Sequence, residues 1–220
     1  QQVDLMGKLA ILGAVGNCLD IVDAWKALRS AALTEDDLIG FLDDGCLGTV
    51  VAGLPVLGPL AQANTMDGVR FICGIGGPRS YRQKPEIVAR LGLPQQRFAT
   101  IVHPAATVSP SARIGAGSCI LANTTVCANV EIGMHVMMLP GCVIGHDTAI
   151  GDCSILAAGV IVSGNVRIGR NCYLGAGSVL RDGISIGERA MVGLGAGVVG
   201  DVEDCAIVTG LPARRRETST

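Results

Sequence analysis

The chain of 220 residues contains only three histidines, His103, His135 and His146. Histidine is the side chain whose ordinary pKa suits proton transfer near neutral pH. His103 precedes a long repeat, in the segment IVHP, which predicts a role in packing or capping. His135, in IGMHV, and His146, in VIGHD, both fall at turns of that repeat, and an exposed turn is the simplest expectation for His135. By repeat position alone these two are nearly equivalent, so the choice between them as a candidate base depends on their neighbours.

Two neighbours favour His146 as a general base. Asp147 follows directly and could orient the imidazole and stabilise the imidazolium. Gly164 lies 18 residues later, in VSGNV, and its backbone N–H could stabilise an oxyanion beside the base. Cys142 is close in sequence, but its position in the repeat directs the thiol inwards. We therefore expect the acceptor, once His146 has deprotonated it, to attack the second substrate directly, without a covalent cysteine intermediate.

The elements that must position these residues form a repeat of six. From Val108 to Val198 every sixth residue is aliphatic over sixteen consecutive positions, and small or β-branched residues stand two places ahead of each, apart from Ile184. A helix would space its apolar residues by three and four, whereas two inward positions and a gap of four fit a short strand and a corner. Glycine and asparagine at or beside the corners suit a positive φ, as at Asn123, Asn129, Asn165 and Gly183.

Three such hexads make one coil of a triangular prism, so sixteen hexads predict about five coils. This repeat resembles that of the hexapeptide-repeat acyltransferases, which implies a left-handed parallel β-helix. We expect an α/β domain over residues 1–103, the β-helix over 104–205, and a C-terminal tail over 206–220.

The first hundred residues predict strands that end in glycine turns or acidic residues. A strand over 8–12 precedes GAVG and a helix over about 17–30, a strand over 38–42 precedes Asp43 and Asp44, and a strand over 69–73 precedes GIGG and a helix over 79–91. Such units in series indicate a Rossmann-like parallel sheet with a ligand at the carboxyl ends of its strands. The turn lacks the full GxGxxG fingerprint, and the two aspartates suit either a ribose or base contact or a solvated turn.

Composition excludes several classes of function. The net charge is −2, with no basic face for nucleic acid, and no run of about 18 apolar residues predicts a membrane span. The nine cysteines form no CxxC motif, and the start of the chain does not have the pattern of a signal sequence. This usage predicts reduced thiols and a cytoplasmic protein.

The order of ILGAVGN, FLDDG, GLPVLG, ICGIGGPRSYR and IVHPAATVSPSARIG resembles the bacterial nucleotide-sugar acyltransferases of the NeuD/PglD type along nearly the whole chain. The resemblance implies N-acetylation of the 4-amino group of a UDP-, GDP- or dTDP-linked 4-amino-4,6-dideoxy sugar, for surface polysaccharides such as O-antigen. Acetyl-CoA would be the cosubstrate, with no metal. The resemblance also implies a homotrimer with acetyl-CoA at the subunit interfaces. One departure is Asn17, which stands where relatives often have a histidine.

The same resemblance assigns the site residues. His146 and Asp147 align with the family's catalytic pair, and Gly164 with the glycine that binds the acetyl group. The acetyl-CoA site would contain Gly164, Asn165, Gly175 and Ala176. The nucleotide-sugar site would contain Gly13, Ala14, Gly16, Asn17, Asp43, Asp44, Gly74 and Gly76.

Three alternatives stay open on the residues. His146 could deprotonate a sugar hydroxyl, which would make the protein a sugar or sialic acid O-acetyltransferase. A metal-dependent carbonic anhydrase would need three histidines that converge on zinc, and His103 lies outside the repeat while His135 and His146 are eleven residues apart. A non-catalytic sugar-nucleotide-binding scaffold is the third possibility, which binding of CoA would distinguish.

Overall fold

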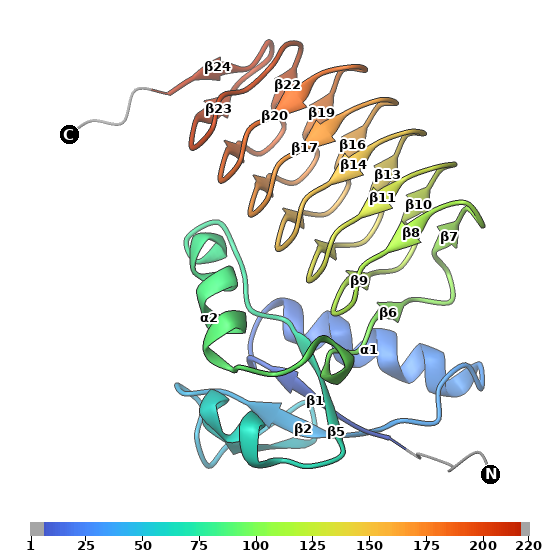
Figure 1. Cartoon of the computed structure of the whole chain (residues 1–220), viewed down its shortest axis with the longest axis vertical. Coiled ribbons are helices and arrows are strands. Elements are labelled where there is room, and N and C mark those ends of the chain that lie inside the picture. The colour runs from blue at the N-terminus through green and yellow to red at the C-terminus, as the bar shows by residue number, and fades with distance from the viewer. Residues whose placement is uncertain (1–6, 217–220) are drawn as a thin grey trace.

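A computed structural model describes residues 7–216 and shows a small sheet domain at one end of a long stack of coils (Figure 1). The sheet domain contains the strands β1 (Lys8–Leu12), β2 (Asp37–Leu42), β3 (Val50–Val51), β4 (Leu54–Gly58) and β5 (Val69–Cys73), in the order β3-β4-β2-β1-β5. β4, β2, β1 and β5 are parallel, and only β3 runs antiparallel to its neighbour. The strands predicted over 8–12, 38–42 and 69–73 are confirmed, while β3 and β4 were not predicted.

Helix α1 (Asn17–Ser30) follows β1 as expected, whereas the helix predicted over 79–91 is wrong in its first part. There the chain forms a 3₁₀ turn, η2 (Tyr81–Gln83), and the α-helix α2 covers only Lys84–Arg90. Pro85 explains the late start, because proline is accepted in the first turn of a helix but not in its interior. Two further 3₁₀ turns, η1 (Leu60–Thr65) and η3 (Gln95–Arg97), complete the domain.

The predicted hexad repeat is confirmed strand by strand. Sixteen two-residue strands, β7 to β22, each end at one of the sixteen aliphatic positions, and each pairs in parallel with the strand 18 residues away. Parallel strands built from hexapeptide repeats fit a left-handed β-helix. Their bounds are β7 (Thr107–Val108), β8 (Arg113–Ile114), β9 (Cys119–Ile120), β10 (Thr125–Val126), β11 (Glu131–Ile132), β12 (Met137–Met138), β13 (Val143–Ile144), β14 (Ala149–Ile150), β15 (Ile155–Leu156), β16 (Ile161–Val162), β17 (Arg167–Ile168), β18 (Tyr173–Leu174), β19 (Val179–Leu180), β20 (Ser185–Ile186), β21 (Met191–Val192) and β22 (Gly197–Val198).

Strands also extend the stack at both ends. β6 (Ile101–Val102) pairs with β9 before the repeat begins. β23 (Ile207–Thr209) pairs in parallel with β21, and β24 (Arg214–Arg215) returns antiparallel to β23. The segment predicted as a tail over 206–220 therefore contributes two strands to the sheet, and its residues 217–220 lie outside the described part of the chain.

The coils form three sheets, which are the three faces of the prism. The docking face holds β6, β9, β12, β15, β18, β21 and β23, the aliphatic face holds β7 to β22 in steps of three, and the charged face holds β8 to β20 in steps of three. The second residue of each strand and the residue two places before the strand's end point into one continuous core, as Ile144 and Cys142 do. The edge between the aliphatic and charged faces, which we call the distal edge, lies opposite the docking face.

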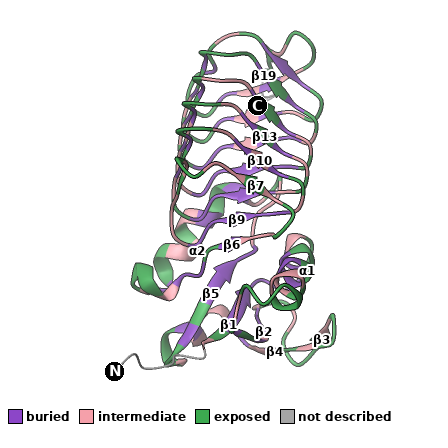
Figure 2. Ribbon diagram, turned by 90° about the vertical axis from the view of Figure 1, so that its right-hand side faces the viewer, coloured by how far each residue is buried: buried purple, intermediate pink, exposed green. Residues whose placement is uncertain are grey.

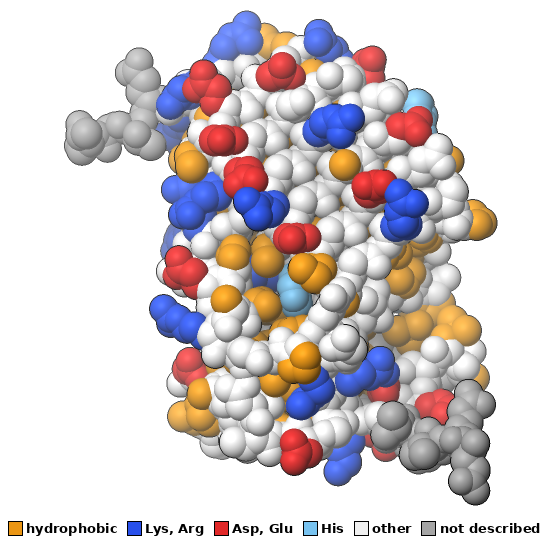
Figure 3. Space-filling view, viewed as in Figure 1, with side chains coloured by type: hydrophobic (Ala, Val, Ile, Leu, Met, Phe, Trp, Pro, Cys, Tyr) orange, Lys and Arg blue, Asp and Glu red, His pale blue; other side chains and the backbone are white. Residues whose placement is uncertain are grey.

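The outward side chains make the three faces different. Cys119, Met137 and Ile155 on the docking face are fully buried, because they share a core with α1 and β1 of the sheet domain. Figure 2 shows this as continuous buried ribbon where the coils meet that domain. The charged face instead carries an ion pair between Arg113 of β8 and Glu131 of β11, and Figure 3 shows acidic and basic side chains spread over the coils.

Every corner from the one between β8 and β9 to the one between β21 and β22 contains one residue in the left-handed region of backbone space. The predicted corner residues Asn123, Asn129, Asn165 and Gly183 have φ values of 58°, 59°, 58° and 70°. Asparagine and glycine are the residues that adopt this conformation most readily. In residues 7–216 no helix is long and apolar enough to cross a membrane.

Candidate active site

His146 and Asp147 form a hydrogen-bonded pair on the distal edge, in the corner between β13 and β14. Nδ1 of His146 lies 2.8 Å from Oδ2 of Asp147, and both side chains are about half exposed. Because the carboxylate accepts the hydrogen from Nδ1, the pair favours the tautomer in which Nε2 is free to accept a proton. The pair has the geometry of an oriented general base.

Asn129 makes a further hydrogen bond to this pair, and it was not predicted as a site residue. Its Nδ2 donates to Oδ1 of Asp147 at 3.0 Å, from the corner one coil earlier. The hydrogen bond from Asn129 and that from His146 hold the pKa of Asp147 below its usual range. The signal in the sequence was the spacing of 18 residues between Asn129 and Asp147, which places the two side chains on one edge.

The imidazole of His146 lies directly on Gly164, as the predicted stacking requires. A methyl group on the Cα of Gly164 would come within 2.8 Å of Nε2 and Cε1 of His146, so only glycine leaves room for the ring. Within residues 7–216 the N–H of Gly164 donates no hydrogen bond, whereas the next residue, Asn165, donates to the carbonyl of His146 at 2.8 Å. Gly164, whose N–H is free, therefore lies against the Nε2 side of the His146 ring.

The expectation that His135 is an exposed corner residue equivalent to His146 is wrong. His135 is only 7% exposed and occupies the left-handed position of its corner, with φ 56°, which is the position of Asp147 rather than of His146. It lies at the edge between the charged and docking faces, where its ring packs edge-on against Phe98 with centroids 4.5 Å apart. Burial, together with the nearby Lys84, lowers the pKa of His135 to about 4.

The expectations for His103 and Cys142 agree with the structure. His103 stabilises the turn before the coils, where its Nδ1 accepts the N–H of Ala105 at 3.0 Å. Cys142 is fully buried in the prism, and burial raises the pKa of its thiol to about 11. A thiol in this environment is protonated at neutral pH and cannot reach a substrate on the distal edge.

A second site lies at the carboxyl ends of β1, β2 and β5, in a cavity of about 430 Å³. Seven of the eight residues predicted for the nucleotide sugar line it, and they are Gly13, Gly16, Asn17, Asp43, Asp44, Gly74 and Gly76. The lining also includes residues that were not predicted, among them Leu60, Gly77 and Ser80. The cavity contains the N-terminus of α1, where Gly16 leaves the first turn without a side-chain cap, and such a terminus favours an anion.

The two aspartates shape the walls of this cavity. Asp43 accepts the N–H of Ala14 at 2.9 Å and the N–H of Gly45 at 2.8 Å, which ties the first glycine turn to the end of β2. Ala14 itself is fully buried and contributes this contact rather than a lining side chain. Asp44 accepts the N–H of Leu60 through one oxygen at 2.8 Å.

The structure does not bring all predicted site residues together within one chain. Gly175 and Ala176 lie in the corner between β18 and β19, which joins the docking and aliphatic faces, away from the distal edge of His146. In the part of the chain that the structure describes, no cluster of three His, Cys, Asp or Glu side chains is arranged to hold a metal ion. All nine cysteines are free thiols.

Residues 147–182 match the family model described as bacterial transferase hexapeptide (six repeats). The acetyltransferase domain of PglB from Neisseria gonorrhoeae, solved with acetyl coenzyme A, is 32% identical over 95% of this chain and 98% of its own, with a TM-score of 0.83. A histidine variant of perosamine N-acetyltransferase from Caulobacter crescentus, with CoA and GDP-perosamine, is 26% identical over 96% and 98%, with a TM-score of 0.85. WeeI from Acinetobacter baumannii is 25% identical over 94% and 99%, with a TM-score of 0.81. No curated protein sequence matches significantly.

A prism of hexapeptide coils with a histidine–carboxylate pair on one edge defines a hexapeptide-repeat acyltransferase. Together with the likeness over the whole chain, it shows that this protein belongs to the NeuD/PglD-type family of nucleotide-sugar acetyltransferases. As a member of that family it is an acetyl-CoA-dependent sugar N-acetyltransferase.

Proposed function

We propose that the protein transfers the acetyl group of acetyl-CoA to the 4-amino group of a nucleotide-linked 4-amino-4,6-dideoxy sugar, with His146 as the general base. The observation that carries this proposal is the position of the imidazole, with Nδ1 on Asp147 and Nε2 beside the free N–H of Gly164. The perosamine N-acetyltransferase among the similar structures has a ligand of this class, GDP-perosamine, together with CoA. Products of this kind suit the assembly of surface polysaccharides.

The arrangement supplies what a direct transfer needs. The sugar ammonium has to lose a proton before its nitrogen can attack the thioester carbon, and Nε2 of His146 would accept that proton. As the amine attacks, negative charge develops on the carbonyl oxygen, and the N–H of Gly164 would stabilise it. The C–N bond then forms, the C–S bond breaks, and the leaving thiolate of CoA takes the second proton that the attacking nitrogen gives up, so CoA leaves as the thiol and His146 returns its proton to solvent. Cys142 has no part in this route because it is buried.

The N-terminal domain, Rossmann-like in its sheet, would bind the nucleotide. The diphosphate would lie at the N-terminus of α1, next to the glycine turns, and the base or ribose would lie near Asp44, which has one carboxylate oxygen without a partner among the described residues. Asn17 would keep this cavity open, since its Nδ2 donates to the carbonyl of Gly76 at 2.7 Å. Titration with UDP, GDP and dTDP would identify the nucleotide.

Two features support a homotrimer with shared sites. His146 lies on the edge opposite the docking face, so the sheet domain of the same chain is on the other side of the prism. A neighbouring subunit would bring its sugar to this edge, and Gly164, Asn165, Gly175 and Ala176 would contact acetyl-CoA from two protomers. The aliphatic face also exposes a ladder of Val143, Ile161 and Val179 at 39%, 43% and 44%, which a neighbour would cover.

The same base and the same N–H would also serve a sugar hydroxyl, which would be O-acetylation, but the N-acetyltransferases among the similar structures favour an amine as the acceptor. A scaffold without catalytic activity is not favoured, because the similar structures include acetyltransferases solved with CoA or acetyl coenzyme A.

The decisive experiment is His146→Ala. We expect kcat to fall about 10²–10⁴-fold while acetyl-CoA still binds, since this is the usual contribution of general-base catalysis. The oligomer and the melting temperature should stay the same, because the His146 side chain is 62% exposed and packs into no core. Steady-state kinetics with an aminosugar nucleotide, together with light scattering, would measure both.

His103→Asn is the matched control, since a short polar side chain can still accept the N–H of Ala105 and the residue lies outside the coils. His135 is unsuitable as a control because it is buried. Near-normal turnover of His146→Ala would refute the assignment of the base. Acetylation of a hydroxyl analogue in preference to the amine would establish the alternative function.

A further inference from the structure

The distal edge carries an axial row of polar corner residues that includes Asp147. Asn129, Asp147 and Asn165 occupy the same corner position in three consecutive coils, with φ values of 59°, 58° and 58°. Below them, Oγ of Ser111 accepts the backbone N–H of Asn129 at 2.9 Å. The corner that presents the amide of Asn129 is therefore fixed at its backbone as well as at its side chain.

The contact between Asn129 and Asp147 decides which carboxylate oxygen the base can use. Nδ2 of Asn129 donates to Oδ1 at 3.0 Å, and Nδ1 of His146 lies 2.8 Å from Oδ2. Both oxygens are thus engaged, one on each side, and the carboxylate cannot rotate about its last bond without losing a hydrogen bond. An exposed aspartate without this second contact would sample several orientations, only some of which align the imidazole.

We propose that Asn129 is a positioning residue of the acetyl transfer, which acts by holding the carboxylate of Asp147 in the orientation that aligns His146. This inference rests on the proposed role of His146 as the base. An amide suits the position for two reasons: it donates to a carboxylate without bringing charge to it, and asparagine tolerates the left-handed backbone of the corner. The hydrogen bond from Asn129 is also the largest cause of the lowered pKa of Asp147.

The test is Asn129→Gly, which removes the amide without strain, because glycine fills the same left-handed position at Gly183 on this edge. We expect kcat to fall about tenfold with little change in KM for either substrate, as the loss of one hydrogen bond to a charged group would cause. A carboxyl-detected NMR titration should show the pKa of Asp147 rising towards its usual range. If Asn129 had a purely structural role, its replacement would change neither kcat nor the pKa of Asp147. Among the described residues His146 is the titratable side chain in contact with Asp147, so it is titrated in parallel.

Asn123→Gly is the matched control, because Asn123 has the same corner position and φ, on the edge between the docking and aliphatic faces. It should leave kcat unchanged. In the background of Asp147→Ala, Asn129→Gly should have no further effect, since Asn129 acts through Asp147. An unchanged kcat for Asn129→Gly, or an equal loss in both backgrounds, would overturn the inference. If His146→Ala retains its turnover, the proposed base has failed instead, which the same assay shows separately.

Discussion

The contacts and the exposure of a histidine in these coils depend on its position, as His135 and His146 show. His146 precedes the left-handed corner residue and projects from the distal edge, where it reaches Asp147 and Gly164. His135 is itself the corner residue, and its ring is enclosed by Phe98 and by Gly117, where a methyl group would come within 2.4 Å of Nδ1. His146 therefore projects into solvent, whereas His135, at another register position and on another edge, is buried against Phe98.

The burial of His135 predicts a pH dependence of stability. Its pKa is lowered to about 4 in the folded protein, so below pH 6.5 the unfolded chain takes up the proton first and folding stability falls as the pH falls towards 4. Lys84 adds to this shift, and Asp152 opposes it. The full shift corresponds to roughly 3 kcal/mol of unfolding free energy.

The measurement compares wild type with His135→Gln by chemical denaturation between pH 7 and pH 4. Wild type should lose more stability than the variant over this range, by up to about 3 kcal/mol, because the variant has no ring to protonate. Parallel pH curves for the two proteins would show that His135 does not become protonated on unfolding.

At the scale of elements, the segment from Gly76 to Arg82 joins the cavity at the carboxyl ends of β1, β2 and β5 to the coils. A methyl group on Gly76 would come within 2.3 Å of Cδ1 of Ile155 on the docking face, so the second glycine turn sits directly on β15. Further along, Tyr81 donates to the carbonyl of Arg189 at 3.1 Å, and Nη2 of Arg82 donates to the same carbonyl at 3.5 Å. The wall of the cavity is therefore built partly on the β-helix.

Arg82→Ala should weaken the attachment of this cavity wall to the β-helix. Because Arg82 is exposed, its contacts are worth little, and we expect KM for the nucleotide sugar to rise only about two- to fivefold. The values of kcat and of KM for acetyl-CoA should not change, since Arg82 lies away from the distal edge. Arg90→Ala, at the exposed end of α2, is the control. An equal rise in both KM values would contradict this account.

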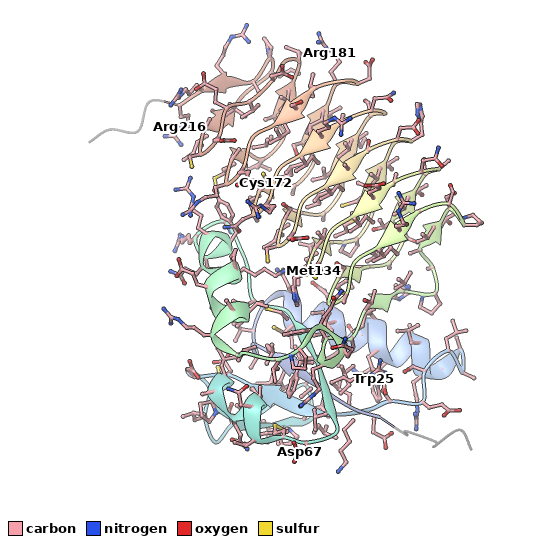
Figure 4. All side chains as sticks on the ribbon, in the orientation of Figure 1. Trp25, Asp67, Met134, Cys172, Arg181 and Arg216 are labelled. Carbon is pink, nitrogen blue, oxygen red and sulfur yellow. The ribbon has the colours of Figure 1, made fainter. Side chains whose placement is uncertain are left out.

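At the scale of the whole molecule, the three faces of the prism have different surroundings. Figure 4 shows Met134 in the corner of the coils near the sheet domain and Arg181, which follows β19 at the distal edge, at the far end from it. The docking face is covered by the sheet domain, the charged face is suited to water, and the aliphatic face exposes its ladder. We therefore expect a neighbouring subunit to cover the aliphatic face.

Ile161→Glu tests the assembly, because it places a carboxylate in the middle of the exposed ladder. We expect dissociation to monomers at micromolar concentration and loss of transfer, since burying an unpaired charge in an interface is costly. Ala149→Glu, at the same strand position on the charged face, should keep the trimer. Light scattering that gives a monomer for wild type, or a trimer for Ile161→Glu, would refute this interface.

The sequence alone determined the coils, since the aliphatic residue of each hexad can be buried only by the hexads above and below it. It also placed His146 on Gly164 and the glycine turns at the ends of β1 and β5, because strand spacing and local backbone conformation determine those positions. The late start of α2 follows from Pro85. The environment of His135 and the contact between Asn129 and Asp147 were decided by the tertiary structure. Each depends on which segment of the chain packs against which face of the prism. The repeat of six residues is the same on all three faces, so it does not predict this packing.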